Sequence, residues 1–206
     1  MVIGICGGSG SGKTTVLKRL ANEFAHFKPS VFSLDNYYKP IDFQEKDLNG
    51  VVNFDLPTAL NRESLINDLN SLIAGQAITV SEYQFNVASA KPNLIQISPS
   101  KLLIVEGIFL LEYNEIFEKL DYTIFMEVDL KIQYERRLKR DQNKRGYSEF
   151  DIKYQWDNHV LPCYDNYINP YKEKCDFIFH NDERMEDDYE YLSKILAEKL
   201  EMQFSS

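Results

Sequence analysis

The sequence predicts an α/β fold of the P-loop NTPase type, in which a five-stranded parallel sheet is flanked by helices. Short apolar runs alternate with segments whose apolar residues recur at helical spacing, which is typical of a parallel sheet covered by helices. A glycine-rich loop stands between the first apolar run and the first helical segment. With 206 residues and 44% hydrophobic content, the chain is long enough for one well-filled core, so we expect a single domain over residues 1–206.

Five apolar runs are the candidate strands of this sheet. They cover Val2 to Cys6, Val31 to Leu34, Leu102 to Val105, Tyr122 to Val128 and Phe177 to Phe179. Four further segments carry apolar residues at a spacing near 3.6 and are predicted helices. Their apolar positions run from Leu17 to Phe24, Leu65 to Ile73, Leu130 to Leu138 and Tyr189 to Leu200.

Residues 77–98 depart from this alternation. The stretches AITVSEYQF and NLIQI are predicted to form two strands joined by a turn at Lys91 and Pro92, so we expect a small hairpin lobe beside the main sheet. Tyr83 and Phe85 alternate along the first of these strands and would therefore share one face.

The glycine-rich loop is the strongest functional motif. GGSGSGKTT matches the pattern GxxxxGK[ST], and the strand before it and the helix after it complete the usual context of a phosphate-binding loop. Backbone N–H groups of such a loop converge on phosphate oxygens at the positive end of a helix. Lys13 would reach the outer phosphates and the Thr14 hydroxyl would bind Mg²⁺. The sequence thus predicts an ATP and Mg²⁺ site with the phosphate-binding residues Gly7, Gly8, Ser9, Gly10, Ser11, Gly12, Lys13, Thr14 and Thr15.

Several classes of protein use such a loop, so other residues must decide the reaction. A GTPase would need a guanine-reading NKxD segment, and the nearest match, NKRG at residues 143–146, has glycine in place of the acid. A motor or remodelling ATPase usually needs more chain. The net charge of -9 disfavours a nucleic-acid binder, which would carry a basic patch. Phosphoryl transfer to a small molecule remains.

Two acidic residues follow predicted strands. Asp35 in SLDNYYK would lie at the carboxyl end of the second strand, where open α/β sheets place ligands and where it could accept the proton of a hydroxyl acceptor. Its alternative role is to cap the next helix or turn. Glu106 closes the run KLLIVE and is a second candidate metal ligand beside Thr14. Its alternative is a helix-capping or salt-bridged glutamate.

The segment YERRLKRDQNKRG is basic in an otherwise acidic chain. On a helix, Arg137 and Arg140 would lie one turn apart on a common face, and Gly146 offers a hinge. We therefore expect a helical lid over about residues 137–150 whose guanidinium groups close over the transferring phosphate, with Arg140 in a catalytic role. The alternative is a solvated helix face.

Taken together, these residues resemble the uridine kinase family, also called uridine-cytidine kinases, within a wider group that includes phosphoribulokinase. The matching pieces are GGSGSGKTT, SLDNYYK, NFDLP, YQF, IVEGI, RRLKRD and RG, in the family's order and with similar separations, over nearly the whole chain. The resemblance implies transfer of the ATP γ-phosphate to the 5′-hydroxyl of uridine or cytidine, in pyrimidine salvage. It also implies a nucleoside as the small-molecule partner, and family members often form homo-oligomers.

The resemblance assigns roles to individual residues. Asp35 matches the family's proton acceptor, and Asp55 in NFDLP matches the carboxylate that holds the ribose hydroxyls. Arg137 corresponds to an arginine near the sugar, while Arg140 and Arg145 correspond to lid arginines near the phosphates. The residues that match the lining of the family's nucleoside pocket are Tyr38, Phe54, Tyr83 and Phe85.

Three positions depart from the family at the base-reading end of the pocket. Ala88 stands where the family usually has a histidine, Tyr147 where an arginine often contacts the base, and Leu56 at a position that is often histidine. Loss of a hydrogen-bonding contact can change discrimination between substrates by orders of magnitude. The alternatives are therefore a kinase of the same fold acting on another nucleoside or a sugar phosphate, and a nucleotide-binding regulator without turnover.

The remaining reactive residues show no site pattern. The scattered histidines have no acid or thiol at metal-ligand spacing, so we interpret them as surface or core residues. No CxxC or Cys/His spacing suggests a disulfide framework or a zinc site around Cys6, Cys163 and Cys175. Since the sequence shows no charged leader and no apolar run of membrane-spanning length, we expect a soluble, cytoplasmic protein.

Overall fold

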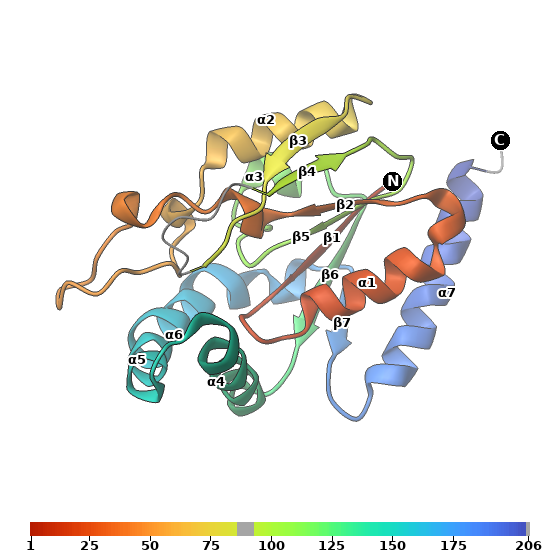
Figure 1. The fold of residues 1–206 in the computed structure, drawn as a ribbon. Helices are drawn as coiled ribbons and strands as arrows, with labels where there is room; N and C mark the ends of the chain where they lie inside the picture. The colour runs from red at the N-terminus through yellow and green to blue at the C-terminus, as the bar shows by residue number, and fades with distance from the viewer. Residues whose placement is uncertain (86–92, 205–206) are drawn as a thin grey trace.

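The computed structural model describes residues 1–85 and 93–204, which form a parallel sheet with helices on both faces (Figure 1). The strands of this sheet are β1 (Val2–Gly7), β2 (Ser30–Ser33), β5 (Leu103–Glu106), β6 (Tyr122–Glu127) and β7 (Phe177–His180). All neighbouring pairs are parallel, and the order across the sheet is β2-β5-β1-β6-β7. The predicted fold class and the five predicted strands are confirmed.

Helices connect the strands and follow the last one. They are α1 (Lys13–Glu23), α2 (Arg62–Ile73), α3 (Asn114–Phe117), α4 (Leu130–Arg145), α5 (Glu149–Gln155), α6 (Leu161–Cys163) and α7 (Met185–Phe204). Short 3-10 segments are η1 (Ala25–Phe27), η2 (Leu34–Tyr37), η3 (Ile41–Phe43), η4 (Pro57–Ala59) and η7 (Asn169–Lys174), and π-helical turns are η5 (Trp156–Val160) and η6 (Tyr164–Ile168). The four predicted helices correspond to α1, α2, α4 and α7.

The hydrophobic core lies in two layers, one on each face of the sheet. Along β1, Ile3 and Ile5 pack with α1 and α7 on one face, while Val2 and Cys6 pack with α2 and the hairpin on the other. This division follows from the two-residue period of a strand, because successive side chains point to opposite faces. A strand buried on both faces needs apolar residues at every position, which explains the continuous apolar runs in the sequence.

The expected hairpin is present as β3 (Ile78–Ser81) and β4 (Leu94–Ile97), which pair antiparallel. Ile78, Val80 and Ile97 are buried in the same core layer as α2. The first strand is shorter than predicted, since it ends at Ser81, and Tyr83 and Phe85 therefore lie beyond it. The predicted turn at Lys91 and Pro92 lies outside the described residues.

Helix α4 differs from the sequence-based expectation in the face that it buries. The apolar spacing suggested Leu130 and Leu138, but Leu130 is 38% exposed and the buried residues are Gln133, Arg137 and Asp141. These three positions are four residues apart and lie on one helical face. α4 thus turns a polar stripe inward, because it covers the candidate site described below rather than the apolar core.

The parallel arrangement gathers several segments at one edge of the sheet. Register pairs Glu106, the last residue of β5, with Ile5 of β1 and with Ser33 of β2. The glycine loop after β1 and η2 after β2 therefore start at the same edge, where open α/β sheets bind ligands. None of the helices in the described part of the chain is long and apolar enough to cross a membrane.

Candidate active site

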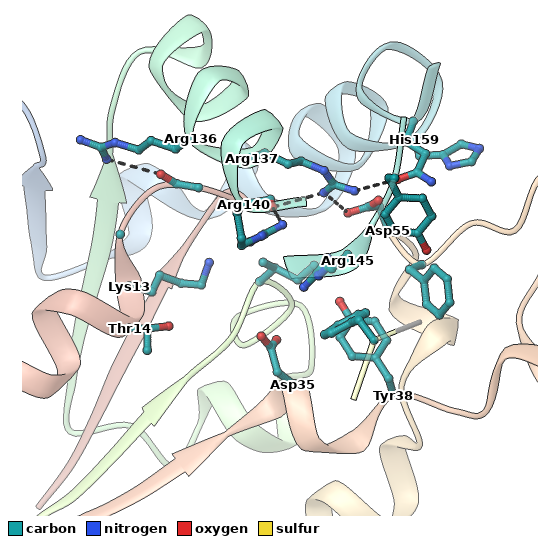
Figure 2. A pocket seen from close by; sticks show the side chains of 18 of the residues that line it. Lys13, Thr14, Asp35, Tyr38, Asp55, Arg136, Arg137, Arg140, Arg145 and His159 are labelled. Atoms are coloured by element: carbon teal, nitrogen blue, oxygen red, sulfur yellow. Dashed lines mark hydrogen bonds and ion pairs between the residues drawn. The ribbon is translucent and has the colours of Figure 1, made fainter. Parts of the chain in front are cut away.

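A cavity of about 230 Å³ opens at this edge of the sheet. In Figure 2, Lys13 and Thr14 lie on one side of it, Arg136 and Arg137 of α4 lie above, and Tyr38 and Asp55 lie on the opposite side, with Asp35 and Arg145 between. The predicted site residues that line the cavity are Ser9, Gly10, Gly12, Lys13, Thr14, Thr15, Asp35, Tyr38, Phe54, Asp55, Phe85, Glu106, Arg137, Arg140 and Arg145. Gly7, Gly8, Ser11 and Tyr83 lie next to it but do not line it.

The glycine loop holds a backbone shape that side chains would prevent. Gly10 and Gly12 have φ values of 83° and 95°, in the left-handed region that favours glycine. A Cβ at Gly10 would come within 2.6 Å of the Gln133 carbonyl oxygen. The carbonyl of Ser11 accepts a hydrogen bond from the Asn181 amide at 2.7 Å. The loop is thus held between α4 and the segment after β7.

Lys13 begins α1, and its ammonium group folds back over the loop. Its Nζ donates hydrogen bonds to the carbonyl oxygens of Gly7 and Gly8, each at 3.0 Å, and the residue is buried. Gly7 and Gly8 therefore contribute to the site through their carbonyl groups. Phosphate oxygens are the strong acceptors that such a buried cation would exchange for these carbonyls.

Two carboxylates, those of Glu106 at the end of β5 and of Asp35 in η2, line the cavity. Glu106 is 4% exposed and accepts a hydrogen bond from the Ser33 hydroxyl at 2.7 Å. Burial, together with the negative charge of Asp35, raises the pKa of Glu106 to about 7, although Lys13 and the Ser33 hydroxyl act in the opposite direction. A cation between the two carboxylates would relieve this unfavourable charge.

These residues fit a magnesium ion held together with a nucleotide. Mg²⁺ is typically bound by one or two carboxylates, substrate phosphates and water rather than by a complete protein cage. The cavity offers the Thr14 hydroxyl and the carboxylates of Glu106 and Asp35. Among residues 1–85 and 93–204, no cluster of three or more His, Cys, Asp or Glu side chains could hold a metal alone.

One buried carboxylate organises the arginines of α4. Asp141 has no solvent exposure and forms ion pairs with Arg137 at 3.3 Å, Arg140 at 2.7 Å and Arg145 at 3.4 Å. Both Arg137 and Arg140 also approach the Ser9 hydroxyl, at 3.2 and 3.5 Å. α4 ends in a left-handed C-cap at Gly146 (φ 69°), the position predicted to act as a hinge.

Arg137 also connects α4 to the acceptor side of the cavity. It pairs with Asp55 at 3.5 Å and donates to the side-chain oxygen of Gln155 at 3.3 Å. Arg137 is 6% exposed and Asp55 7%, so this is a buried ion pair. Separating such a pair would leave an uncompensated buried charge. The pair therefore holds the two side chains in position relative to each other.

The predicted aromatic lining forms a compact cluster of rings. Measured between ring centroids, Phe85 lies 5.1 Å from Tyr38, 4.8 Å from Tyr83 and 6.1 Å from Phe54, and all three pairs are edge to face. The guanidinium carbon of Arg145 lies 3.8 Å from the Phe85 ring centroid, a cation–π contact. Arg145, expected near the phosphates, thus reaches the aromatic side of the cavity. Ala88 lies outside the described residues.

Sequence reasoning missed several residues of the site. Arg136, Gln155 and His159 line the cavity, and Asp141 supports it from behind. His159 is a buried residue whose Nε2 lies 2.8 Å from a carboxylate oxygen of Asp47. No local spacing could indicate that pair, because the two residues are 112 positions apart. The sequence indicated Asp141 only as the last residue of the matching piece RRLKRD.

Residues 2–186 match the model of the family described as "Phosphoribulokinase / Uridine kinase family". A uridine kinase from Brevibacillus brevis is 34% identical over 178 residues, which cover 86% of this chain and 83% of that one. A uridine kinase from Clostridium botulinum is 35% identical over 181 residues, which cover 86% of each chain.

Solved structures show the same fold at lower identity. A protein described as a possible uridine kinase from Bacillus stearothermophilus has a TM-score of 0.62 at 19% identity and covers 87% of this chain and 88% of its own. Shikimate kinase from Acinetobacter baumannii has a TM-score of 0.53 at 15% identity, covering 97% and 94%. Both likenesses concern the arrangement of sheet and helices.

Proposed function

The chain belongs to the phosphoribulokinase/uridine kinase family and is a kinase, and we propose that it transfers the γ-phosphoryl group of ATP to the 5′-hydroxyl of uridine or cytidine. The observation that carries the proposal is a single cavity lined by Lys13 of the phosphate loop, by Asp35 and by the Asp55–Arg137 pair. The cellular role would be salvage of pyrimidine nucleosides in the cytoplasm.

The phosphate end would bind ATP through the backbone of the glycine loop. Lys13 would leave the carbonyls of Gly7 and Gly8 and pair with the outer phosphates. Thr14 and Glu106 would hold Mg²⁺, which when bound supplies positive charge to the phosphate oxygens. Burial and the charge of Asp35 disfavour the ionised form of Glu106, and a cation bound next to Glu106 would favour that form.

The acceptor end would hold the ribose through Asp55. A carboxylate can accept hydrogen bonds from both hydroxyls of a vicinal diol, and Arg137 holds this carboxylate in place at 3.5 Å. The base would then lie toward Tyr38, Phe54 and Phe85, whose rings form the apolar side of the cavity. Holding both reactants in one orientation is a large part of the catalysis expected for phosphoryl transfer.

Asp35 would act as the proton acceptor of the reaction. The 5′ oxygen forms a bond to the γ-phosphorus while the bond from that phosphorus to the bridging oxygen breaks, and ADP leaves with the bonding electron pair. The hydroxyl proton passes to Asp35. Arg140, oriented by Asp141, would offset the charge of the transferring group, and closure of the lid over residues 137–150 would exclude water.

A second candidate is a kinase of this fold that phosphorylates another hydroxyl compound. The observation that favours it is the lining of the acceptor end, where Tyr147 takes part in place of a basic residue. A regulator without turnover is less well supported, since a protein that only binds nucleotide needs no carboxylate at Asp35.

The test is acceptor-dependent ADP release from Mg·ATP with uridine, cytidine, purine nucleosides, deoxynucleosides and sugar phosphates. We expect uridine or cytidine to give the highest kcat/KM and Lys13→Met to abolish turnover. A different leading acceptor would replace the substrate assignment and leave the kinase assignment intact. Nucleotide binding without turnover of any acceptor would favour the regulator.

A further inference from the structure

A second cavity adjoins the acceptor end of the first. It has a volume of about 420 Å³ and lies between the loop that follows η3 and helix α5. Four residues line both cavities, namely Val52, Phe54, Tyr147 and Gln155. A molecule whose hydroxyl end lay at Asp35 and whose other end passed these residues would therefore enter the second cavity.

The surface that this second cavity offers to a ligand is mostly carbon. Ile41, Val51 and Phe150 contribute apolar side chains, and Ile41 and Phe150 are 51% and 79% exposed. Large apolar side chains that gather around an open cavity commonly mark a binding site.

Three polar side chains around the second cavity, those of Tyr154, Asp151 and Gln155, already form hydrogen bonds within the protein. The Tyr154 hydroxyl donates to Asp47 at 2.7 Å and accepts from the Asn49 amide at 2.6 Å, so its ring rather than its hydroxyl remains for a ligand. A carboxylate oxygen of Asp151 accepts from the Ser148 hydroxyl at 2.7 Å.

The side-chain oxygen of Gln155 accepts from Arg137 at 3.3 Å. Since the polar atoms named for Tyr154, Asp151 and Gln155 are used within the protein, a polar ligand would gain less from this cavity than an apolar one.

Tyr147 is held at the boundary between the two cavities. Its backbone N–H donates to the Asp141 carbonyl at 3.3 Å, just after the left-handed turn at Gly146 that ends α4. The position of Tyr147 is thus coupled to the helix that carries the arginines. A tyrosine there supplies an aromatic face where a longer basic side chain would extend toward the ligand.

We propose that the second cavity receives an apolar substituent on the base of the acceptor, so that the preferred acceptor is a nucleoside with a hydrophobic base substituent. This inference rests on the proposed function, since it takes the ribose to be held by Asp55 and the base to lie toward Phe54 and Tyr147. A single methylene group in an apolar pocket changes kcat/KM by about tenfold or more, so a butyl or phenyl group gives a measurable preference.

The experiment compares kcat/KM for uridine with that for uridines carrying butyl or phenyl groups at C5 or N3, and with 5-carboxymethyluridine. We expect at least one apolar derivative to exceed uridine by about tenfold and the charged derivative to gain nothing. Ile41→Trp, which fills the second cavity, removes this preference, so that within this variant kcat/KM for the apolar derivative no longer exceeds kcat/KM for uridine. Leu48→Trp, on the loop that follows η3 and fully exposed, keeps it.

A binding measurement separates this inference from the proposed function. Calorimetry with the 5′-deoxy forms of the same compounds, which keep the ribose diol but lack the 5′-hydroxyl that would be phosphorylated, reports affinity without turnover. Turnover of uridine with no preference in either assay would overturn the inference and leave the proposed function standing. If no nucleoside is phosphorylated and the apolar 5′-deoxy forms bind no better than 5′-deoxyuridine, both are wrong.

The remaining outcomes concern a different occupant. If Ile41→Trp and Phe150→Ala change the sedimentation of the protein while the acceptor preference stays the same, the apolar surface belongs to a contact between copies of the chain, and the inference is overturned. If the protein sediments identically in all variants and the preference follows the second cavity, the acceptor is its occupant.

Discussion

The two ends of the first cavity are built in different ways. The phosphate end is built mainly on one continuous stretch, residues 7–15, whose shape depends on backbone conformations such as those of Gly10 and Gly12. The acceptor end is assembled from side chains of separate segments, including Tyr38, Phe85 and Tyr147. A backbone cradle needs the same residues wherever it occurs, whereas a pocket of side chains can change one residue at a time. The phosphate end thus carries the shared chemistry, and the acceptor end carries what is particular to this chain.

Asp35 lies between the two ends, and its substitution is the strongest test of the comparison. We expect Asp35→Asn to lower kcat by about 10² to 10⁴-fold, because the hydroxyl loses its proton acceptor while the phosphate-binding residues stay in place. The KM for ATP should change little. Steady-state kinetics with the best acceptor measures both, and Asp42→Asn, an exposed acid in η3, is the control. Comparable losses in ATP affinity and in kcat would show that Asp35 belongs to the phosphate end instead.

Asp141 connects the two ends through the arginines that it holds. Asp141→Asn leaves three guanidinium groups without their shared buried carboxylate, and we expect a loss of about 3 to 5 kcal/mol in the free energy of unfolding. The melting temperature should fall by roughly 10 °C. Thermal unfolding without ligand measures this, with Glu135→Gln on the exposed face of α4 as the control. Equal melting temperatures for the two variants would contradict the role given to Asp141.

The phosphate end could be predicted from the sequence almost completely. Its residues are neighbours in the chain, and their spacing follows from the shape of the backbone, as for Gly12, Lys13 and Thr14. The parallel sheet was equally accessible, because strands buried on both faces appear as continuous apolar runs. Asp35 and Glu106 could be located from the strands that they follow, since parallel strands end at one edge of the sheet.

The acceptor end could be predicted only in part, for physical reasons. The residues around it meet through tertiary packing, so Gln155 and His159 gave no local signal. The apolar spacing gave the wrong buried face for α4, because the face that this helix buries is polar and holds charged groups such as Asp141. Tyr83 and Phe85 were placed on a strand that ends earlier, although their rings do meet, 4.8 Å apart.

Glu106 tests the phosphate end, because its raised pKa makes the stability of the folded chain depend on pH. Its pKa of about 7 in the folded chain exceeds the ordinary value of 4.5, so folding favours the protonated form, and stability falls as the pH rises from about 4.5 to about 7. Glu106→Gln removes this penalty, and we expect the variant to gain on the order of 3 kcal/mol at pH 8 without ligands and almost nothing at pH 4.

Denaturant unfolding across this pH range measures the difference between Glu106→Gln and the wild type. Glu201→Gln, an exposed glutamate near the end of α7, should show no such pH dependence. Nucleotide with Mg²⁺ should stabilise the wild type more than Glu106→Gln at pH 8, because only the wild type gains a ligand for the cation. A stability difference independent of pH would mean that the pKa of Glu106 is the same in the folded and the unfolded chain.

The smallest expected effect lies at the acceptor end and concerns Phe85. Phe85→Leu keeps an apolar side chain but removes the ring that contacts Tyr83 and supports Arg145, contacts worth about 1 kcal/mol. We expect the KM for the acceptor to rise about threefold to tenfold while the KM for ATP stays the same. Acceptor and ATP titrations measure the two constants, and Phe43→Leu, an exposed aromatic in η3, is the control. A matching rise in the KM for ATP would mean that Arg145 couples the aromatic side to the phosphates, so that the two ends respond to ligands together.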